Sequence, residues 1–124
     1  MKTGIVIFAH GSSVPSANEA VRSVTRQVQE SGGYELVDTA FLEAARPDLA
    51  EAVAGLVNRG AGRIVVAPYF LTLGIHLQRD LPKIVESISL AHHGVEIVVT
   101  PPLDGHPTLS AILLERLQPV GLRK

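Results

Sequence analysis

The feature that most constrains this chain is a regular alternation of short β-branched runs with longer amphipathic segments. Four such pairs follow one another, a pattern that indicates consecutive βα units. The predicted strands are Gly4 to Ala9, Glu35 to Leu42, Arg63 to Tyr69 and Val95 to Thr100. The first, third and fourth are apolar throughout, as buried parallel strands tend to be. We therefore predict an α/β protein with a four-stranded, mainly parallel sheet and helices on both faces, a flavodoxin-like arrangement.

Two helices are expected before the third strand. The first runs from Pro15 to Ser31 and stops at Gly32 and Gly33, which are typical of helix ends. Its predicted inward face consists of Ala17, Val21, Val24 and Val28. The second helix begins at Pro47, a favoured first helical position, and ends at Gly60. Its predicted inward residues are Leu49, Val53, Leu56 and Val57.

Two further helices flank the fourth strand. The third helix is predicted from Pro82 to His92, with Ile84, Val85 and Ile88 buried. The fourth is predicted from Pro107 to Leu117, with Leu109, Ile112 and Leu113 buried.

Length and composition restrict the possible classes of protein. The chain has 124 residues and a mass of 13.2 kDa, which fits one domain over residues 1–124. With 46% apolar residues, it can bury a core and is not compositionally disordered. A net charge of −1 gives no general attraction for nucleic acid or for an anionic membrane, so neither is expected as a partner.

The absence of cysteine excludes thiolate metal sites, iron–sulfur clusters and a cysteine nucleophile. Any metal must therefore be held by His, Asp, Glu or water, and there are five histidines to consider. The apolar run from Gly4 to Ala9 meets polar residues at once, so it is too short for a signal sequence or a membrane span. We therefore expect a cytoplasmic protein.

Ligands of open α/β sheets bind beyond the carboxyl ends of the strands, so the residues after each strand are the informative ones. His10 follows the first strand and His76 lies in the segment after the third. Two histidines from different loops at one edge form a plausible divalent-metal pair, whereas one alone is more often structural. Glu43 follows the second strand and could be a metal ligand or a general base, or else a solvated charge or a partner of Arg46.

Other residues near this edge could bind an anionic ligand. The segment Gly11 to Ser13 could expose backbone N–H groups to a phosphate, although neither nucleotide-binding glycine pattern is present. Alternatively, Ser12 or Ser13 caps the first helix. Arg46, Arg79 and Lys83 could pair with ligand carboxylates, or could be ordinary solvated charges.

Several polar residues have structural explanations. Asp80 is expected to cap the third helix and Asp104 to occupy a turn before Gly105. His92 and His93 suit a helix end. His106 precedes the last helix at the ligand edge and could border the site.

Taken together, ordered segments along nearly the whole chain are similar to one known family. They are His10-Gly11-Ser12, Phe41-Leu42-Glu43 with Pro47, Val66 to Leu71, Gly74-Ile75-His76 with Asp80-Leu81-Pro82, and Pro102 to Pro107. This set resembles the CbiX/SirB family of class II tetrapyrrole chelatases.

The resemblance implies ATP-independent insertion of a divalent metal into sirohydrochlorin, with cobalt as the first candidate and iron or nickel as the others. No further cofactor is implied. His10 and His76 match the family's metal-handling histidines, and Glu43 matches an acidic site position for which the resemblance implies a role as proton acceptor. Ser12, Arg46 and Arg79 are the candidate substrate-binding residues. The chain corresponds to one half of the longer chelatases, which implies a symmetric homodimer with both strand edges facing the ligand cleft.

Two other functions fit the same residues. A non-catalytic module of this fold could hold a metal or an anionic tetrapyrrole for delivery, and it would need the same histidine pair. A structural or regulatory subunit would tolerate replacement of His10 and His76. Insertion itself requires exchangeable ligands and removal of two pyrrole protons, and neutral imidazoles can serve in both roles near pH 7.

Overall fold

The structure is a computed structural model that describes residues 1–122. It contains one four-stranded sheet in the order β2-β1-β3-β4, and all three strand pairs are parallel. The strands are β1 (Lys2–Ala9), β2 (Leu36–Phe41), β3 (Ala61–Pro68) and β4 (Glu96–Val99). The helices are α1 (Pro15–Gly32), α2 (Leu49–Asn58), α3 (Ile75–Ala91) and α4 (Thr108–Leu117), followed by the short 3-10 helix η1 (Gln118–Val120). The predicted fold class is confirmed; the end of the predicted domain, residues 123–124, lies outside the described residues.

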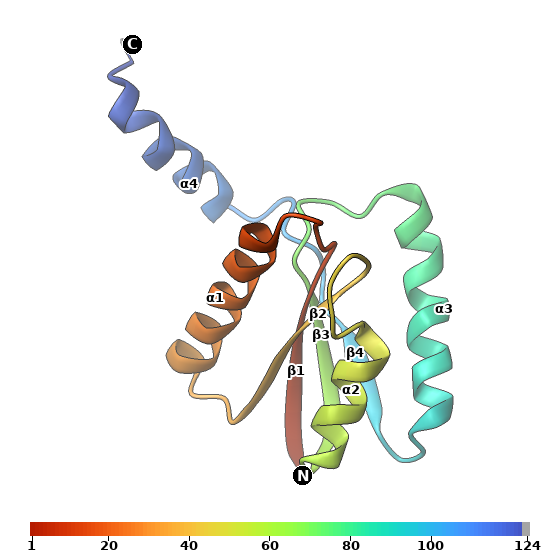
Figure 1. Ribbon diagram of the computed structural model, residues 1–124. Helices are drawn as coiled ribbons and strands as arrows, with labels where there is room; N and C mark the ends of the chain where they lie inside the picture. Colours follow the sequence, from red (N-terminus) through yellow and green to blue (C-terminus); the bar gives the residue numbers. More distant parts are fainter. Residues whose placement is uncertain (123–124) are drawn as a thin grey trace.

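The sheet is covered from both sides, as predicted. In Figure 1, α1 lies on one side of the strands, and α2 and α3 lie on the other. The central strand β1 pairs with β2 through Ile7 and Thr39 and with β3 through Ile7 and Ala67. The β1–β3 register shifts once, between Lys2 and Thr3, and is regular from Thr3 onward, so the carboxyl ends of β1, β2 and β3 meet at one edge of the sheet.

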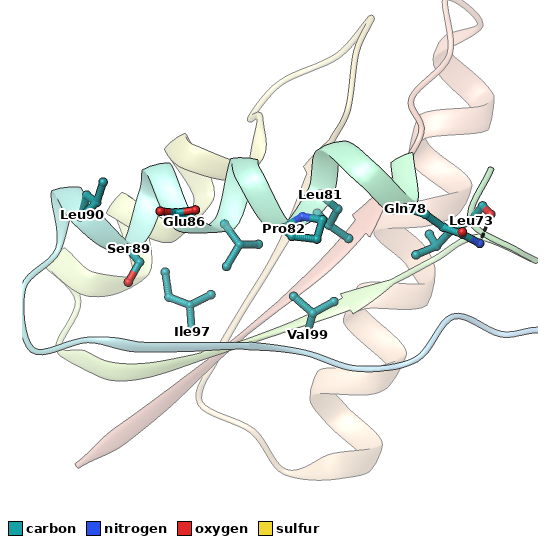
Figure 2. Close-up of a pocket in the computed structure, with 10 residues that line it drawn as sticks. Leu73, Gln78, Leu81, Pro82, Glu86, Ser89, Leu90, Ile97 and Val99 are labelled. Carbon is teal, nitrogen blue, oxygen red and sulfur yellow. Dashed lines mark hydrogen bonds between the residues drawn. The ribbon is translucent and has the colours of Figure 1, made fainter. Parts of the chain in front are cut away.

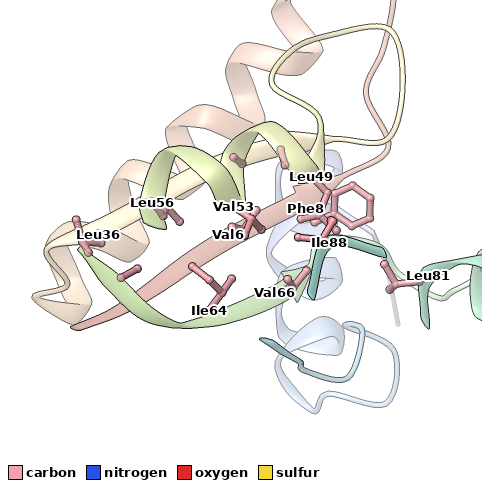
Figure 3. Packing of buried hydrophobic residues seen from close by; sticks show 13 residues of the cluster. Val6, Phe8, Leu36, Leu49, Val53, Leu56, Ile64, Val66, Leu81 and Ile88 are labelled. Atoms are coloured by element: carbon pink, nitrogen blue, oxygen red, sulfur yellow. The ribbon is translucent and has the colours of Figure 1, made fainter. Parts of the chain in front are cut away.

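The main core lies between the sheet and the pair α2 and α3. Figure 3 shows side chains from β1 and β3 packed against side chains from both helices. The labelled members of this cluster include Val6, Phe8, Ile64, Val66, Leu49, Val53, Leu56, Leu81 and Ile88. Alternate residues of β1 and β3 thus face this core, which leaves the intervening residues on the α1 side.

Helix α1 has the predicted bounds to within one residue, but its buried face is more polar than predicted. Ala17 is exposed, whereas Asn18 and Thr25 are the buried residues of the helix. The Thr25 and Thr39 hydroxyl oxygens lie 2.7 Å apart, so one hydroxyl donates a hydrogen bond to the other inside the structure. Hydrophobic periodicity missed these positions because their burial depends on partners elsewhere in the chain.

Helix α2 does not begin at Pro47. Asp48 is its N-cap: the Asp48 carboxylate accepts the Glu51 N–H at 2.8 Å, and the Glu51 carboxylate accepts the Asp48 N–H at 2.9 Å. This reciprocal capping box satisfies donors that a helix start otherwise leaves free, so it sets the first residue at Leu49. Leu49, Val53 and Leu56 are buried as predicted.

Helix α3 begins at Ile75, about two turns before the predicted start. The prediction relied on the preference of proline for the first turn, but Pro82 lies inside the helix. Gly74, in an extended conformation, is the N-cap. Leu77 and Leu81 lie on the same face of α3 as the predicted inward residues, and this face packs against the core. That packing offsets the loss of the backbone hydrogen bond that Pro82 cannot donate.

Helix α4 has nearly the predicted bounds, but its predicted burial is wrong. None of its residues is buried; Ile112 is 48% exposed and Leu113 is 64% exposed. Figure 1 shows α4 projecting from the carboxyl edge of the sheet, away from the strands. Leu109 is partly buried near Tyr69 and Leu103, but most other apolar side chains of α4 stay exposed in the described part of the chain.

Among residues 1–122, no helix is both long enough and apolar enough to cross a membrane.

Candidate metal and substrate site at the carboxyl edge of the sheet

The segments that follow β1 and β2 are joined by backbone hydrogen bonds beyond the ends of the strands. Leu42 N–H donates to the Ala9 carbonyl at 2.9 Å, and Glu43 N–H donates to the His10 carbonyl at 3.0 Å. This ladder places the side chains of His10 and Glu43 side by side. His10 Nε2 lies 2.7 Å from Glu43 Oε1, and both side chains are exposed to solvent.

The contact with Glu43 determines which nitrogen of His10 is available. An ionised carboxylate only accepts hydrogen bonds, so Nε2 of His10 carries the hydrogen. In the neutral ring, Nδ1 then keeps its lone pair and can bind a metal or accept a proton. The sequence left open whether Glu43 pairs with Arg46, and the structure shows that it pairs with His10 instead.

Gly11 permits the close approach of these two segments. Its φ of +90° lies in the region that favours glycine, and a Cβ atom at this position would lie 1.9 Å from the Glu43 carbonyl oxygen. A side chain here would therefore push the two segments apart. The packing of the backbone therefore requires glycine at this position, whether or not a ligand also approaches it.

Ser12 does not cap α1. The N-cap is Val14, which has no side-chain cap, and Val14 N–H donates to Ser12 Oγ at 3.0 Å. The Asn18 amide holds the Ser12 backbone on both sides, accepting its N–H at 2.9 Å and donating to its carbonyl at 2.8 Å. Ser12 thus lies in a firmly held turn beside His10, and its hydroxyl hydrogen is not used in the bond with Val14.

Phe70 is a site residue that the sequence did not single out. Its ring lies edge-on to His10, with 6.3 Å between ring centroids, and edge-on to Phe8 at 5.9 Å. Phe70 therefore braces the imidazole against the core. Only its position after the third strand pointed to it, because an aromatic residue there is equally expected in a core.

His76 lies in the first turn of α3, where the prediction placed a loop. Its Nδ1 is 3.2 Å from Nη2 of Arg79, one helical turn further on. A guanidinium only donates, so Nδ1 of His76 accepts this bond and Nε2 carries the hydrogen in the neutral ring. Arg79 also contacts Asp80 at 3.4 Å. Asp80 lies inside α3, so the prediction that it caps the helix is wrong.

The two predicted metal-binding histidines thus lie in separate clusters at this edge. His10 contacts Glu43, and His76 contacts Arg79. Over residues 1–122, no three His, Cys, Asp or Glu side chains are grouped closely enough to hold a metal ion. The single chain therefore presents separate ligands and no closed cage of three such groups.

Arg46 forms an ion pair with Glu51 at the start of α2. The Asp48 backbone N–H and then the Arg46 guanidinium lower the pKa of Glu51, and Glu51 in turn raises the pKa of Arg46. Arg46 is nevertheless largely exposed, so its remaining N–H groups face solvent.

His92 and Asp104 have the predicted structural positions, whereas His106 was expected to border the site. His92 is the C-cap of α3, and its N–H donates to the Ser89 carbonyl at 3.1 Å. Asp104 precedes Gly105, whose φ is +80°. His106 Nδ1 accepts the Thr108 N–H at 3.1 Å, so it contributes a hydrogen bond at the start of α4.

A cavity of about 560 Å³ lies between α3 and β4. Figure 2 shows that Leu81, Ile97 and Val99 contribute to its walls, and none of the predicted site residues lines it. Its mainly aliphatic walls offer few metal-binding atoms, so the chemistry of the chain lies at the carboxyl edge.

The fold and this edge define an α/β protein of the doubly wound class, with imidazole and carboxylate side chains at the ends of parallel strands. The CbiX family model matches residues 4–120, and the chain belongs to that family.

Comparisons with individual proteins agree with this assignment. The chain is 31% identical to the sirohydrochlorin cobaltochelatase of Methanopyrus kandleri, covering 92% of this chain and 94% of that one. It is 32% identical to the chloroplastic sirohydrochlorin ferrochelatase of Arabidopsis thaliana, covering 93% of this chain but only 51% of the relative, about half its length. The solved structure of Bacillus subtilis SirB with Fe3+ has the same fold, with a TM-score of 0.90 and 22% identity, and the match covers 99% of this chain and 49% of that one.

Proposed function

We propose that this chain inserts a divalent metal into sirohydrochlorin without ATP, in the biosynthesis of tetrapyrrole cofactors. The observation that carries the proposal is the contact between His10 and Glu43 at the carboxyl edge of the sheet. The two curated relatives, named as sirohydrochlorin chelatases, support the same activity. No cofactor is required beyond the metal substrate itself.

His10 suits the two tasks of the reaction, which are to present the metal and to take up protons from the pyrrole nitrogens. Nδ1 is the free nitrogen of the neutral ring, and an imidazole releases a divalent metal more readily than a thiolate does. Glu43 holds the opposite nitrogen and stabilises the imidazolium that forms when Nδ1 takes a proton. In this proposal, Glu43 thus orients the ring of His10 through its contact with Nε2.

His76 is the proposed second metal ligand. Its Nδ1 is engaged by Arg79, so metal binding requires either loss of that contact or loss of the hydrogen from Nε2. The peripheral carboxylates of the substrate offer Arg79 an alternative partner. Substrate binding would then free His76 for the metal.

The proposed substrate contacts are Ser12, Arg46 and Arg79. Each has at least one hydrogen-bond donor beyond those used inside the chain, and guanidinium groups bind carboxylates in a bidentate manner. Lys83 is exposed on the same helix as Arg79 and could add a further positive charge.

Cobalt is our first candidate metal, with iron and nickel as alternatives. Imidazole and carboxylate ligands accept all three. The relatives named above include a cobaltochelatase and a ferrochelatase.

We propose that the working unit is a symmetric homodimer in the cytoplasm. The SirB chain is about twice as long as this one and matches it over half its length. A second copy of this chain would supply the corresponding half, with the two carboxyl edges facing one cleft.

The test is an anaerobic absorbance assay of the purified protein with sirohydrochlorin and, separately, Co2+, Fe2+ and Ni2+. We expect metallation faster than the protein-free rate, with losses of about 100-fold or more in His10→Ala and His76→Ala. His93→Ala is the matched control, because His93 is exposed at a helix end, and it should keep full activity.

Two outcomes would contradict the proposal. Full activity in both site variants would remove the proposed roles of His10 and His76. Stoichiometric binding of metal or tetrapyrrole with no turnover, for every metal tested, would instead support the delivery module.

A further inference from the structure

Asn18 is a buried polar residue close to the candidate site, and the proposed mechanism gives it no role. It lies near the start of α1 and is only 6% exposed. Its Oδ1 accepts the Ser12 N–H at 2.9 Å, and its Nδ2 donates to the Ser12 carbonyl at 2.8 Å. One side-chain amide thus binds both backbone groups of a single residue, as a neighbouring strand does in a sheet.

The turn that Asn18 binds connects the site to the helix. The segment from His10 to Val14 belongs to neither β1 nor α1. Val14 is the N-cap of α1 and has no side-chain cap, and its N–H donates to Ser12 Oγ at 3.0 Å. Ser12 therefore joins the end of β1 to the start of α1 through both its backbone and its side chain.

Helix α1 is itself fixed on the sheet, along which it runs from the carboxyl edge (Figure 1). The buried hydroxyls of Thr25 on α1 and Thr39 on β2 lie 2.7 Å apart. Asn18 and Thr25 are seven residues apart, so they share one face of the helix. Between them, the Arg22 guanidinium lies 5.2 Å from the centre of the ring of Phe41, the last residue of β2. This face of α1 therefore fixes Asn18 relative to β2.

Only Gly11 separates Ser12 from His10. The His10 carbonyl accepts the Glu43 N–H at 3.0 Å, and Ser12 is bound by Asn18 two residues further on. Gly11 packs so closely on Glu43 that a Cβ atom would lie 1.9 Å from the Glu43 carbonyl oxygen. Loss of the Asn18 amide would thus release one side of the backbone that carries the imidazole, without removing either partner of the 2.7 Å contact between His10 and Glu43.

We propose that Asn18 is a positioning residue for metal insertion, and that it acts by holding the His10 imidazole against Glu43. The inference rests on the proposed function, because it assigns Asn18 a role in the same reaction. Both bonds of the amide go to the Ser12 backbone, so Asn18 acts through the turn and not on the metal or the pyrrole nitrogens. A displacement of a reacting group by about 1 Å can cost about 100-fold in rate.

The arrangement requires an amide at position 18. A carboxylate could still accept the Ser12 N–H, but its second oxygen would face the Ser12 carbonyl with no hydrogen to donate. Asn18→Asp is therefore a nearly isosteric change that removes one of the two bonds. Asn18→Ala removes both.

The rate of metal insertion by the full chain is the first test. In the anaerobic absorbance assay at pH 8, where an aspartate is ionised, we expect both Asn18 variants to be about 10- to 100-fold slower than the wild type. Gln29→Ala is the matched control and should keep the full rate. The Gln29 amide lies on the same helix and donates to the Glu35 carbonyl at 3.2 Å, but at the opposite end of the sheet. Far-UV circular dichroism should show wild-type helix content in all three variants.

The nitrogen NMR spectrum of the histidine rings separates positioning from a general loss of structure. In the wild type at pH 8, the contact with Glu43 keeps the hydrogen on Nε2, so His10 should give the signals of one neutral tautomer. In both Asn18 variants we expect a share of the other tautomer. The signals of His92 and His93 should not change. The His10 signals are identified by their loss in His10→Ala.

Two results would overturn the inference. One is a full insertion rate in both Asn18 variants. The other is slow insertion with an unchanged His10 spectrum, which would assign the loss to stability alone. Failure of the proposed function gives a different result: if the wild type inserts no metal, that function is wrong, and the His10 spectrum by itself then decides whether Asn18 positions the imidazole.

Discussion

At the scale of single residues, the site depends on contacts that the backbone imposes. His10 and Glu43 follow adjacent parallel strands, and the hydrogen bond between the Glu43 N–H and the His10 carbonyl fixes their relative position. The side-chain contact at 2.7 Å then decides which imidazole nitrogen is free. The chemistry of this pair is therefore sensitive both to the charge of Glu43 and to the space at Gly11.

The charge of Glu43 can be removed with little change in shape. We expect Glu43→Gln to slow metal insertion about 100-fold, because the amide can still accept the His10 hydrogen bond but no longer stabilises an imidazolium. Sirohydrochlorin affinity, measured by absorbance titration without metal, should change little. Glu30→Gln, an exposed change on α1, is the control. An unchanged insertion rate would show that Glu43 is only a solvated surface charge with no role in the reaction.

The space at Gly11 can be tested through stability. Gly11→Ala should lower the free energy of unfolding by about 1 to 3 kcal/mol, because the new methyl group meets the Glu43 carbonyl and the residue has a positive φ. Gly55→Ala is the matched control, since no atom lies within 4 Å of its Cβ position in α2. That change should raise stability by up to about 1 kcal/mol. Urea unfolding measures both, and equal effects would show that the two segments can move apart freely.

At the scale of elements, caps and packing set the helix bounds more than proline does. Pro47 precedes α2 and Pro82 lies within α3, although both are residues that suit a helix start. Asp48 and Glu51 satisfy each other's backbone at the start of α2. Packing against the core keeps α3 helical across Pro82.

The capping box of α2 yields a direct test. Asp48→Ala should lower the free energy of unfolding by about 1 kcal/mol, because the Glu51 N–H loses its acceptor. Asp104→Ala, in an exposed turn, should change it by less than about 0.5 kcal/mol. Urea unfolding at neutral pH compares the two variants, and a stable Asp48→Ala protein would mean that water replaces the cap without loss.

At the scale of the whole molecule, the described chain has one well-packed side and one incomplete side. The core beneath α2 and α3 is closed, whereas the half-sheet formed by β3 and β4 on the α1 side lacks a helix. Stability should therefore depend on association with a second copy.

Thermal unfolding over a range of protein concentrations can detect this dependence. We expect the wild-type Tm to rise by several degrees between micromolar and hundred-micromolar protein, because mass action favours a folded dimer. A wild-type Tm that does not change with concentration would show that the chain folds without a partner.

The sequence by itself determined the order of the elements, the parallel sheet and the edge at which the polar residues gather. These features follow from hydrophobic period and strand composition, which are local properties of the chain. Tertiary structure alone decided that His10 pairs with Glu43, 33 residues away, that Arg46 pairs with Glu51, and that α4 leaves the sheet it was predicted to cover. Strand order and register bring distant side chains together, and an apolar stripe shows that a helix needs a partner without identifying which surface provides it.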